Sequence, residues 1–461
     1  MNFIYLILFI TGIIAIASIM NFKEDIKNYL LKITLPEITY IGNRILIVVP
    51  HPDDETIATG GIIQKAVKSN IPIKVVIATS GENYRKSAML FFKKAHLKKE
   101  EYSEFGFVRQ SESLNALKSM GLSEEDIIFL GFSDGTLRYL WCENWEKDFP
   151  KLSPTTKSTS VFYERAYLKG IPYSGEAFVE ALEKIIKDLN PTDIYYPIAE
   201  DMHPDHWACH NFVKYTILSL KLNIKEHMFL VHHPEWLVPW GSNKNKPLLP
   251  PSNLIESNIN WHYINLEEDE IIKKYHAVKT YKTQIEVMEP FLTAFVRKTE
   301  LFGEKSPILI PKLSYEPNLE QYLLSHSMFG VYSGGVLEEE MYKSADLTKF
   351  TIFYYANTLY IGIQSAKPIS KKVLYRFQMR FFYKDDTIKR VDIGVINDKL
   401  YNYNFAKNSL NDLAIEMRTY KKQIWILIKL PKDEIKHIFM GVDSIYKNRF
   451  IDKIPWNVYI F

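Results

Sequence analysis

Between residues 44 and 197, short apolar runs rich in β-branched side chains alternate with longer segments whose apolar residues recur at helical spacing. The strand-like runs are 44–49, 73–78, 126–130 and 193–197, and the helical segments are 56–69, 108–120 and 175–189. Strands that alternate with helices in this way predict a parallel sheet covered by helices on both faces. We therefore expect an α/β domain with a Rossmann-like sheet.

The pattern changes beyond residue 308, where Tyr and Phe become frequent and apolar residues alternate with polar ones. Such period-2 runs occupy 351–363, 375–382 and 423–430, and turn residues separate them. This pattern predicts an antiparallel β-sandwich over residues 315–461. Its aromatic residues have two interpretations: exposed rings that stack on sugars in a carbohydrate-binding accessory domain, or ordinary core and cross-strand packing.

The segment 3–20 is apolar and uncharged, and it has about the length of a helix that crosses a bilayer. It predicts an uncleaved N-terminal membrane anchor. A cleaved signal peptide is the alternative, but no positive n-region precedes the segment and no small-x-small cleavage site follows it. Lys23, Lys27 and Lys32 lie just after the segment, which favours a cytoplasmic catalytic domain, although so small a charge bias leaves the side of the membrane open.

Length and composition support this division of the chain. A chain of 461 residues is too long for a single core, and 47% hydrophobic with 24% charged residues is typical of folded globular domains. We expect an anchor with its juxtamembrane segment (1–32), an α/β domain (33–314) that includes a long Pro- and Asn-rich loop (239–258), and the β-sandwich (315–461). The net charge of +3 comes without a basic stripe, so we expect no nucleic-acid partner. Two cysteines, Cys142 and Cys209, are too few for a disulfide framework.

Candidate chemistry follows two of the predicted strands. The residues 51–55 (HPDDE) come directly after the first strand, and 201–206 (DMHPDH) follow the strand 193–197. Ligands of an open parallel sheet bind at the carboxyl ends of its strands, so both loops belong to one rim. Imidazole and carboxylate groups suit zinc or iron(II), and a catalytic site needs three protein ligands. His51, Asp54 and one histidine of the second loop would supply them.

Each loop could alternatively be an ordinary helix N-cap after a Pro turn, with no catalytic or metal-binding role. Two such loops at strand ends of the same sheet are much harder to explain in that way. Among the other histidines, His210 lies one helical turn after His206 and is expected to point along the helix face. Of His232 and His233, we expect one to face the cleft.

Taken together, the motifs resemble those of the PIG-L or LmbE-like zinc N-deacetylases over residues 44 to 303. The matching pieces are VPHPDDE (49–55), ATSGE (78–82), Arg109 with Glu112, LGFSDG (130–135), HPDH (203–206), YKTQ (281–284) and ELF (300–302). Any one piece is weak, but their order and spacing make the resemblance specific. The two loops with the metal-ligand residues show no departure from the family pattern.

The resemblance implies a role for each matching residue. It implies one zinc ion per chain, with His51, Asp54 and His206 as its ligands. Asp53 would be the general base and His203 its acid partner. Arg109 and Asp134 would lie on the sugar side of the pocket. Without the resemblance, Arg109 would be taken for a salt-bridged surface residue and Asp134 for a turn residue.

The leading hypothesis is therefore a zinc-dependent hydrolase that removes the acetyl group from N-acetylglucosamine in a glycolipid, glycoconjugate or polysaccharide. One alternative is an amidase that acts on another N-acylated conjugate, such as an amidated thiol. A second alternative is a non-enzymatic, sugar-binding membrane protein, which would need neither the base nor a complete ligand set. A dinucleotide-binding oxidoreductase is disfavoured because no G-x-G-x-x-G follows the first strand.

Overall fold

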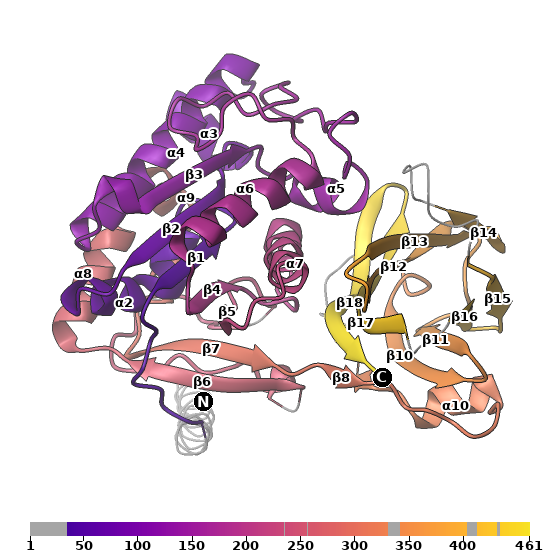
Figure 1. Ribbon diagram of the computed structural model, residues 1–461. Helices are drawn as coiled ribbons and strands as arrows, with labels where there is room; N and C mark the ends of the chain where they lie inside the picture. Colours follow the sequence, from indigo (N-terminus) through magenta and orange to yellow (C-terminus); the bar gives the residue numbers. More distant parts are fainter. Residues whose placement is uncertain (1–34, 235, 256, 331–341, 403–412, 431–433) are drawn as a thin grey trace, which may run out of the picture.

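The computed structural model describes residues 35–461 except 235, 256, 331–341, 403–412 and 431–433. Within them lie an α/β region and a β-sandwich that pack side by side (Figure 1). The predicted fold class is confirmed for both.

The α/β region is built on a seven-stranded sheet with the strand order β3-β2-β1-β4-β5-β7-β6. Its strands are β1 (Ile45–Val49), β2 (Ile73–Thr79), β3 (Ile127–Phe132), β4 (Asp193–Pro197), β5 (Lys225–Phe229), β6 (Ile259–Asn265) and β7 (Thr299–Lys305). The first five run parallel, and β7 and β6 add an antiparallel edge. All five residues of β1 are buried, as expected for a parallel strand covered on both faces.

Helices cover this sheet (Figure 1). They are α2 (Asp54–Lys68), α3 (Arg85–Phe92), α4 (Lys99–Ser119), α5 (Leu137–Cys142), α6 (Gly175–Leu189), α7 (Pro204–Ser219), α8 (Glu268–Val278) and α9 (Lys282–Thr293), with short 3₁₀ turns at Glu124–Asp126 and Ser252–Leu254. The bounds of α6 and β4 match the sequence prediction. Helix α4 begins nine residues before the predicted start at 108, where the Glu101 carboxylate accepts the Lys98 amide at 2.7 Å. Its first turns carry many charged residues, which hid the helical period.

The β-sandwich packs a five-stranded sheet, β15-β16-β11-β10-β9, against a six-stranded sheet, β14-β13-β12-β17-β18-β8. The strands are β8 (Ile308–Leu309), β9 (Phe329–Gly330), β10 (Leu347–Tyr355), β11 (Thr358–Ser365), β12 (Val373–Tyr383), β13 (Ile388–Ile396), β14 (Lys399–Asn402), β15 (Ile415–Thr419), β16 (Gln423–Lys429), β17 (Ile435–Tyr446) and β18 (Arg449–Ile460), and helix α10 (Leu319–Ser325) lies before β9. The predicted run 351–363 is a hairpin, because Ala356 and Asn357 adopt positive φ angles of 46° and 60° between β10 and β11.

The sandwich and the α/β region share a buried interface. Trp141 of α5 packs edge-on against Trp456 of β18 with ring centroids 4.9 Å apart, and both rings belong to the core of the α/β region. The Arg380 guanidinium of β12 packs against both rings, 4.9 Å from the centre of the Trp141 ring and 5.3 Å from that of Trp456. Figure 1 shows β17 and β18 next to α5 and α7. The sandwich is therefore docked on the α/β region through its six-stranded sheet.

The predicted membrane localisation must be corrected. Across the described residues, no helix combines the length and the apolar character that a bilayer crossing requires. The segment 3–20, on which the prediction of a single-pass anchor rested, lies outside the described residues.

Candidate metal centre and active site

The carboxyl ends of the central strands converge on one polar cluster. β1 leads into His51 and the start of α2, β4 leads into the loop that ends at His206, and β3 leads into Asp134. The sheet order changes direction between β1 and β4, and such a switch point leaves a crevice where ligands bind. The topology therefore brings the two predicted loops together.

The predicted ligand residues meet at a single carboxylate oxygen. Asp54 Oδ2 lies 3.2 Å from His51 Nδ1 and 3.1 Å from His206 Nε2. Ligand atoms about 2.0 to 2.2 Å from a tetrahedral zinc ion lie roughly 3.3 Å apart, so each of these two separations suits a pair of ligands on one cation. His51, Asp54 and His206 are all buried.

The unsatisfied polar atoms of the cluster also fit a cation. His51 Nε2 and both ring nitrogens of His206 are buried and make no hydrogen bond of good geometry among the described residues. Asp201 Oδ2 lies 3.1 Å from His206 Nδ1, the arrangement in which a carboxylate orients a metal-binding histidine. Burial alone would raise the pKa of Asp54, but attraction to His206 and His51 holds it well below its usual range. The Asp54 carboxylate is thus ionised and available to a cation.

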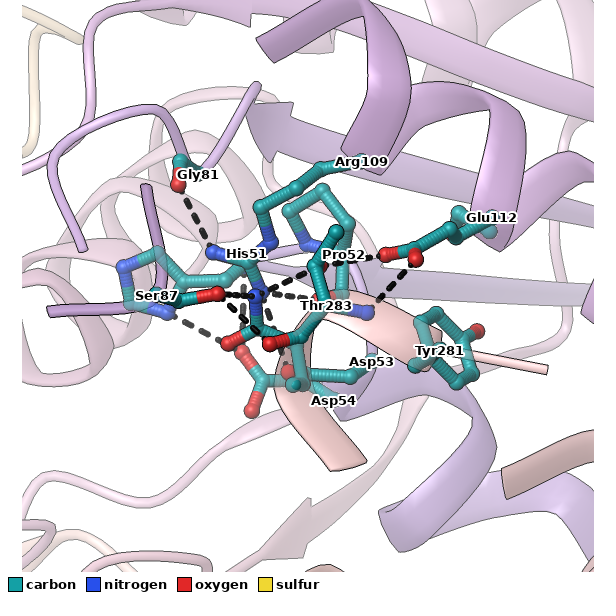
Figure 2. A network of polar contacts seen from close by, with 12 residues as sticks. His51, Pro52, Asp53, Asp54, Gly81, Ser87, Arg109, Glu112, Tyr281 and Thr283 are labelled. Atoms are coloured by element: carbon teal, nitrogen blue, oxygen red, sulfur yellow. Dashed lines mark hydrogen bonds and ion pairs between the residues drawn. The ribbon is translucent and has the colours of Figure 1, made fainter. Parts of the chain in front are cut away.

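Asp53 lies beside this set and is held by Arg109. Arg109 Nη2 donates to Asp53 Oδ2 at 3.0 Å and to the Pro52 carbonyl at 2.5 Å, while Nη1 donates to the Gly81 carbonyl at 2.8 Å (Figure 2). Asp53 has a φ of 120°, an unusual conformation for a residue with a side chain. Burial raises the pKa of Asp53 to about 8, against the attraction of Arg109. A carboxylate with such a pKa can exchange a proton near neutral pH.

His203 is the N-cap of α7, and a backbone contact fixes its tautomer. Its Nδ1 accepts a hydrogen bond from the Asp205 amide at 3.2 Å, so the proton of the neutral ring is assigned to Nε2. Burial and the neighbouring histidines, His51 first among them, hold the pKa of His203 well below its usual value. The ring is therefore neutral, with one N–H available as a donor.

Asp134, expected on the sugar side, is engaged with the cluster itself. Its Oδ1 lies 3.3 Å from His51 Nε2, and its Oδ2 accepts the Asn83 amide at 3.0 Å. Burial alone would raise the pKa of Asp134, but attraction to His51 outweighs it and lowers the pKa to about 2. Asp134 and Arg109 also line the pocket.

A pocket of about 250 Å³ opens beside the cluster. Its polar wall carries the residues described above, including His51, Asp53 and His203, and its apolar wall consists of Ile57, Met288, Phe291 and Leu292. His232 belongs to this lining, whereas His233 Nδ1 contacts the Pro234 carbonyl and His210 Nδ1 contacts the Pro197 carbonyl. The pocket can take a small group with one apolar and one polar side.

Several residues around the cluster were not assigned an individual role from the sequence. Asp201 contacts His206, and Asp205 lies 3.4 Å from His51 and accepts the Gly135 and Leu137 amides. Glu55 accepts the Tyr281 hydroxyl at 2.6 Å and the Asp53 amide at 3.0 Å. Metal-binding histidines usually contact a carboxylate, so the two aspartates that flank His203 in the sequence were the available signal.

Further residues of the matching motifs support the site from outside it. Glu112 accepts the backbone amide and the hydroxyl of Thr283 at 2.8 and 2.7 Å, which ties α4 to the start of α9 (Figure 2). The Ser133 hydroxyl and the Asp134 amide both donate to Glu82. These motif positions therefore hold loops in place.

The fold and the site together define an α/β protein with a candidate His/Asp metal centre at the switch point of its parallel-rich sheet. The model of the family described as PIG-L, GlcNAc-PI de-N-acetylase, matches residues 46–217. This part of the chain is a PIG-L family domain.

The curated relatives carry related names. A probable N-acetyl-α-D-glucosaminyl L-malate deacetylase 2 of Bacillus subtilis is 29% identical over 168 residues, which is 36% of this chain and 57% of the relative. A 1D-myo-inositol 2-acetamido-2-deoxy-α-D-glucopyranoside deacetylase of Rhodococcus opacus is 28% identical over 203 residues, which is 44% of this chain and 59% of the relative. The chain thus spans less than two thirds of the length of these relatives.

Solved structures match the chain at lower identity. The N,N′-diacetylchitobiose deacetylase of Pyrococcus horikoshii is 17% identical with a TM-score of 0.37, and the match covers 61% of this chain and 91% of that one. A conserved protein from Thermus thermophilus is 18% identical with a TM-score of 0.33, and the match covers 54% and 84%.

Proposed function

We propose that this protein is a zinc-dependent hydrolase that removes the acetyl group from an N-acetylglucosamine-containing conjugate. The observation that carries the proposal is the convergence of His51 Nδ1 and His206 Nε2 on Asp54 Oδ2, at 3.2 and 3.1 Å, with Asp53 adjacent in the chain. The names of the curated relatives support an N-acetylated glucosamine as the substrate class.

The three ligands of the proposed ion are His51, Asp54 and His206. When bound there, zinc supplies Lewis acidity, which polarises a carbonyl and makes water more acidic. Two imidazoles and one carboxylate match the ligand types that zinc prefers at catalytic sites.

The neighbouring residues carry the proton transfers. Asp53 accepts the proton of the attacking water, since its pKa of about 8 places it near the working range of a general base. The neutral His203 ring donates its Nε2–H as a hydrogen bond to the developing oxyanion, and the proton that Asp53 took from water then passes to the departing amine. Arg109 fixes the Asp53 carboxylate by its 3.0 Å hydrogen bond. Acetate and a free amino sugar are the products.

The pocket fits an acetamido group. Its apolar wall, with Met288 and Phe291, can receive the methyl group and a face of the sugar ring, while the polar wall carries the reacting groups.

The test uses the full-length protein. We expect it to contain one zinc ion per chain and to release acetate from N-acetylglucosamine glycosides, to lose this activity on treatment with a chelator, and to regain it with Zn²⁺. The Asp53→Asn variant is expected to keep its metal and to lose activity by roughly 10²- to 10⁴-fold. Unchanged turnover of this variant would remove Asp53 as the base.

The choice of substrate decides between this proposal and its alternatives. A panel of N-acylated conjugates is assayed for acetate and for other acids. Release of another acid in preference to acetate would assign an amidase of different specificity, and binding of sugar without any hydrolysis would assign a binding protein.

A further inference from the structure

One side chain of the β-sandwich reaches the loop that carries the histidines. Lys453 lies on β18 and is 6% exposed. Its Nζ donates a hydrogen bond to the backbone carbonyl of Asp201, which precedes His203 and His206 in the loop after β4. Burying an ammonium group is costly unless it is well paired, so a lysine at this position needs an explanation beyond packing.

Asp201 holds the histidine loop together. Its Oδ2 accepts the amides of Val231 and His232, each at 3.0 Å, and lies 3.1 Å from His206 Nδ1. Its Oδ1 accepts the His203 amide at 2.9 Å. A shift of Asp201 would therefore move the loop after β4 and change the orientation of the His206 ring.

The sandwich fixes the place of Lys453. Lys453 pairs across the sheet with Asp443 of β17, and Asp443 receives two hydrogen bonds from Arg376 of β12, at 3.0 and 2.7 Å. Arg376 also donates to Glu143, at the end of α5, at 3.3 Å. Arg376, Asp443 and Lys453 lie opposite one another on three adjacent strands, so they share the side of the six-stranded sheet that faces the α/β region. The position of the Lys453 ammonium therefore depends on the docking of the whole sandwich.

We propose that the β-sandwich is a fixed part of the metal centre and that Lys453 is a positioning residue, which acts through Asp201 to keep His206 in its ligand orientation. The inference rests on the proposed function for its metal, but it does not depend on the substrate. It assigns the C-terminal region a role in assembling the site.

The test replaces Lys453 in the full-length protein. Lys453→Met keeps the length and the apolar stem but removes the donor. We expect Zn²⁺ affinity, measured by competition with a chromophoric chelator, to fall by about 10- to 100-fold. We also expect the visible absorption of the Co²⁺-loaded variant to change and kcat to fall more than KM rises. Lys447→Met, an exposed lysine in the turn between β17 and β18, is the matched control and should leave all three readouts unchanged.

A second variant covers the case in which Lys453→Met does not fold. Asp201→Asn keeps the carbonyl that Lys453 contacts but weakens the hold on His206, and it should lower Zn²⁺ affinity to a similar extent. Wild-type metal affinity and Co²⁺ spectrum in either variant would overturn the inference while leaving the proposed function intact. A wild-type protein that binds metal but releases no acetate would overturn the proposed function, and a Lys453→Met loss of affinity would still support the inference.

Discussion

Arg109 makes three contacts that only a guanidinium can make together. It donates to the carbonyls of Gly81 and Pro52 and to the carboxylate of Asp53, from two nitrogen atoms of one planar group. Its side chain is 4% exposed, so little of it remains for a ligand. This geometry favours a role in holding Asp53 over direct recognition of a sugar.

The Arg109→Lys substitution separates these roles. A lysine keeps the charge but cannot replace the fork of donors, so Asp53 would lose its fixed position. We expect kcat to fall by roughly 10²-fold with little change in KM, as for a small misplacement of a reacting group. Arg165→Lys, at an exposed arginine that donates to Ser111, is the control. A rise in KM with unchanged kcat would instead assign Arg109 to substrate binding.

At the scale of elements, α2 presents Asp54 to the cluster and depends on a buried ion pair. The helix is kinked at Thr59, where φ is −131°. Two amides just beyond the kink, those of Gly61 and Ile62, donate to Glu300 of β7 at 2.6 and 3.1 Å. Lys274 of α8 pairs with the same carboxylate at 2.6 Å, and neither side chain of the pair is exposed. The kinked helix is thus attached to both β7 and α8.

Removing one partner of this pair should destabilise the fold. Lys274→Met leaves the Glu300 carboxylate buried without its counter-ion, which typically costs about 3 to 5 kcal/mol, so we expect a loss of that size in the free energy of unfolding. Urea denaturation measures it. The double variant Lys274→Met with Glu300→Gln should lose less than the sum of the two single losses, because the uncompensated charge is gone. Additive losses would show that the two residues act independently.

At the scale of the whole molecule, the interface between sandwich and α/β region contains a titratable side chain. His437 of β17 stacks on Phe382 with ring centroids 4.4 Å apart and is 8% exposed. Burial, with Lys436 and Lys214 nearby, lowers the pKa of His437 to about 4. The unfolded chain, with a histidine pKa near ~6.5, therefore binds a proton between pH ~6.5 and ~4 that the folded protein does not bind.

The stability of the protein should accordingly fall as the pH decreases through this window. Between pH ~7 and ~5 we expect His437 to account for a loss of at most roughly 2 kcal/mol in the free energy of unfolding. His437→Gln should remove this part of the pH dependence, and His96→Gln, at an exposed histidine, should leave it unchanged. If the free energy of unfolding depended on pH in the same way in His437→Gln and in the wild type, the expectation would be wrong.

Local sequence patterns determined the elements of the α/β region and which residues lie at its strand ends. The run ILIVV predicted β1, and the segments 175–189 and 193–197 predicted α6 and β4, because buried parallel strands and amphipathic helices leave a clear apolar period. The two polar loops after β1 and β4 followed from the same argument. The fold of the α/β region and the meeting of these two loops could therefore be predicted without coordinates, whereas the assignment of individual ligands rested on the family resemblance.

Tertiary structure alone decided how those residues are used. Local spacing cannot show that Arg109, 56 residues after Asp53, would hold that carboxylate, or that Asp134 would contact His51. The clearest case is β12, whose alternation of apolar and polar residues predicted a strand with two different faces but not what covers each face. Arg376 and Arg380 on the polar face are each 1% exposed, because the α/β region covers them. Strand alternation reports which side chains share a face, whereas what covers that face depends on contacts between segments far apart in the chain.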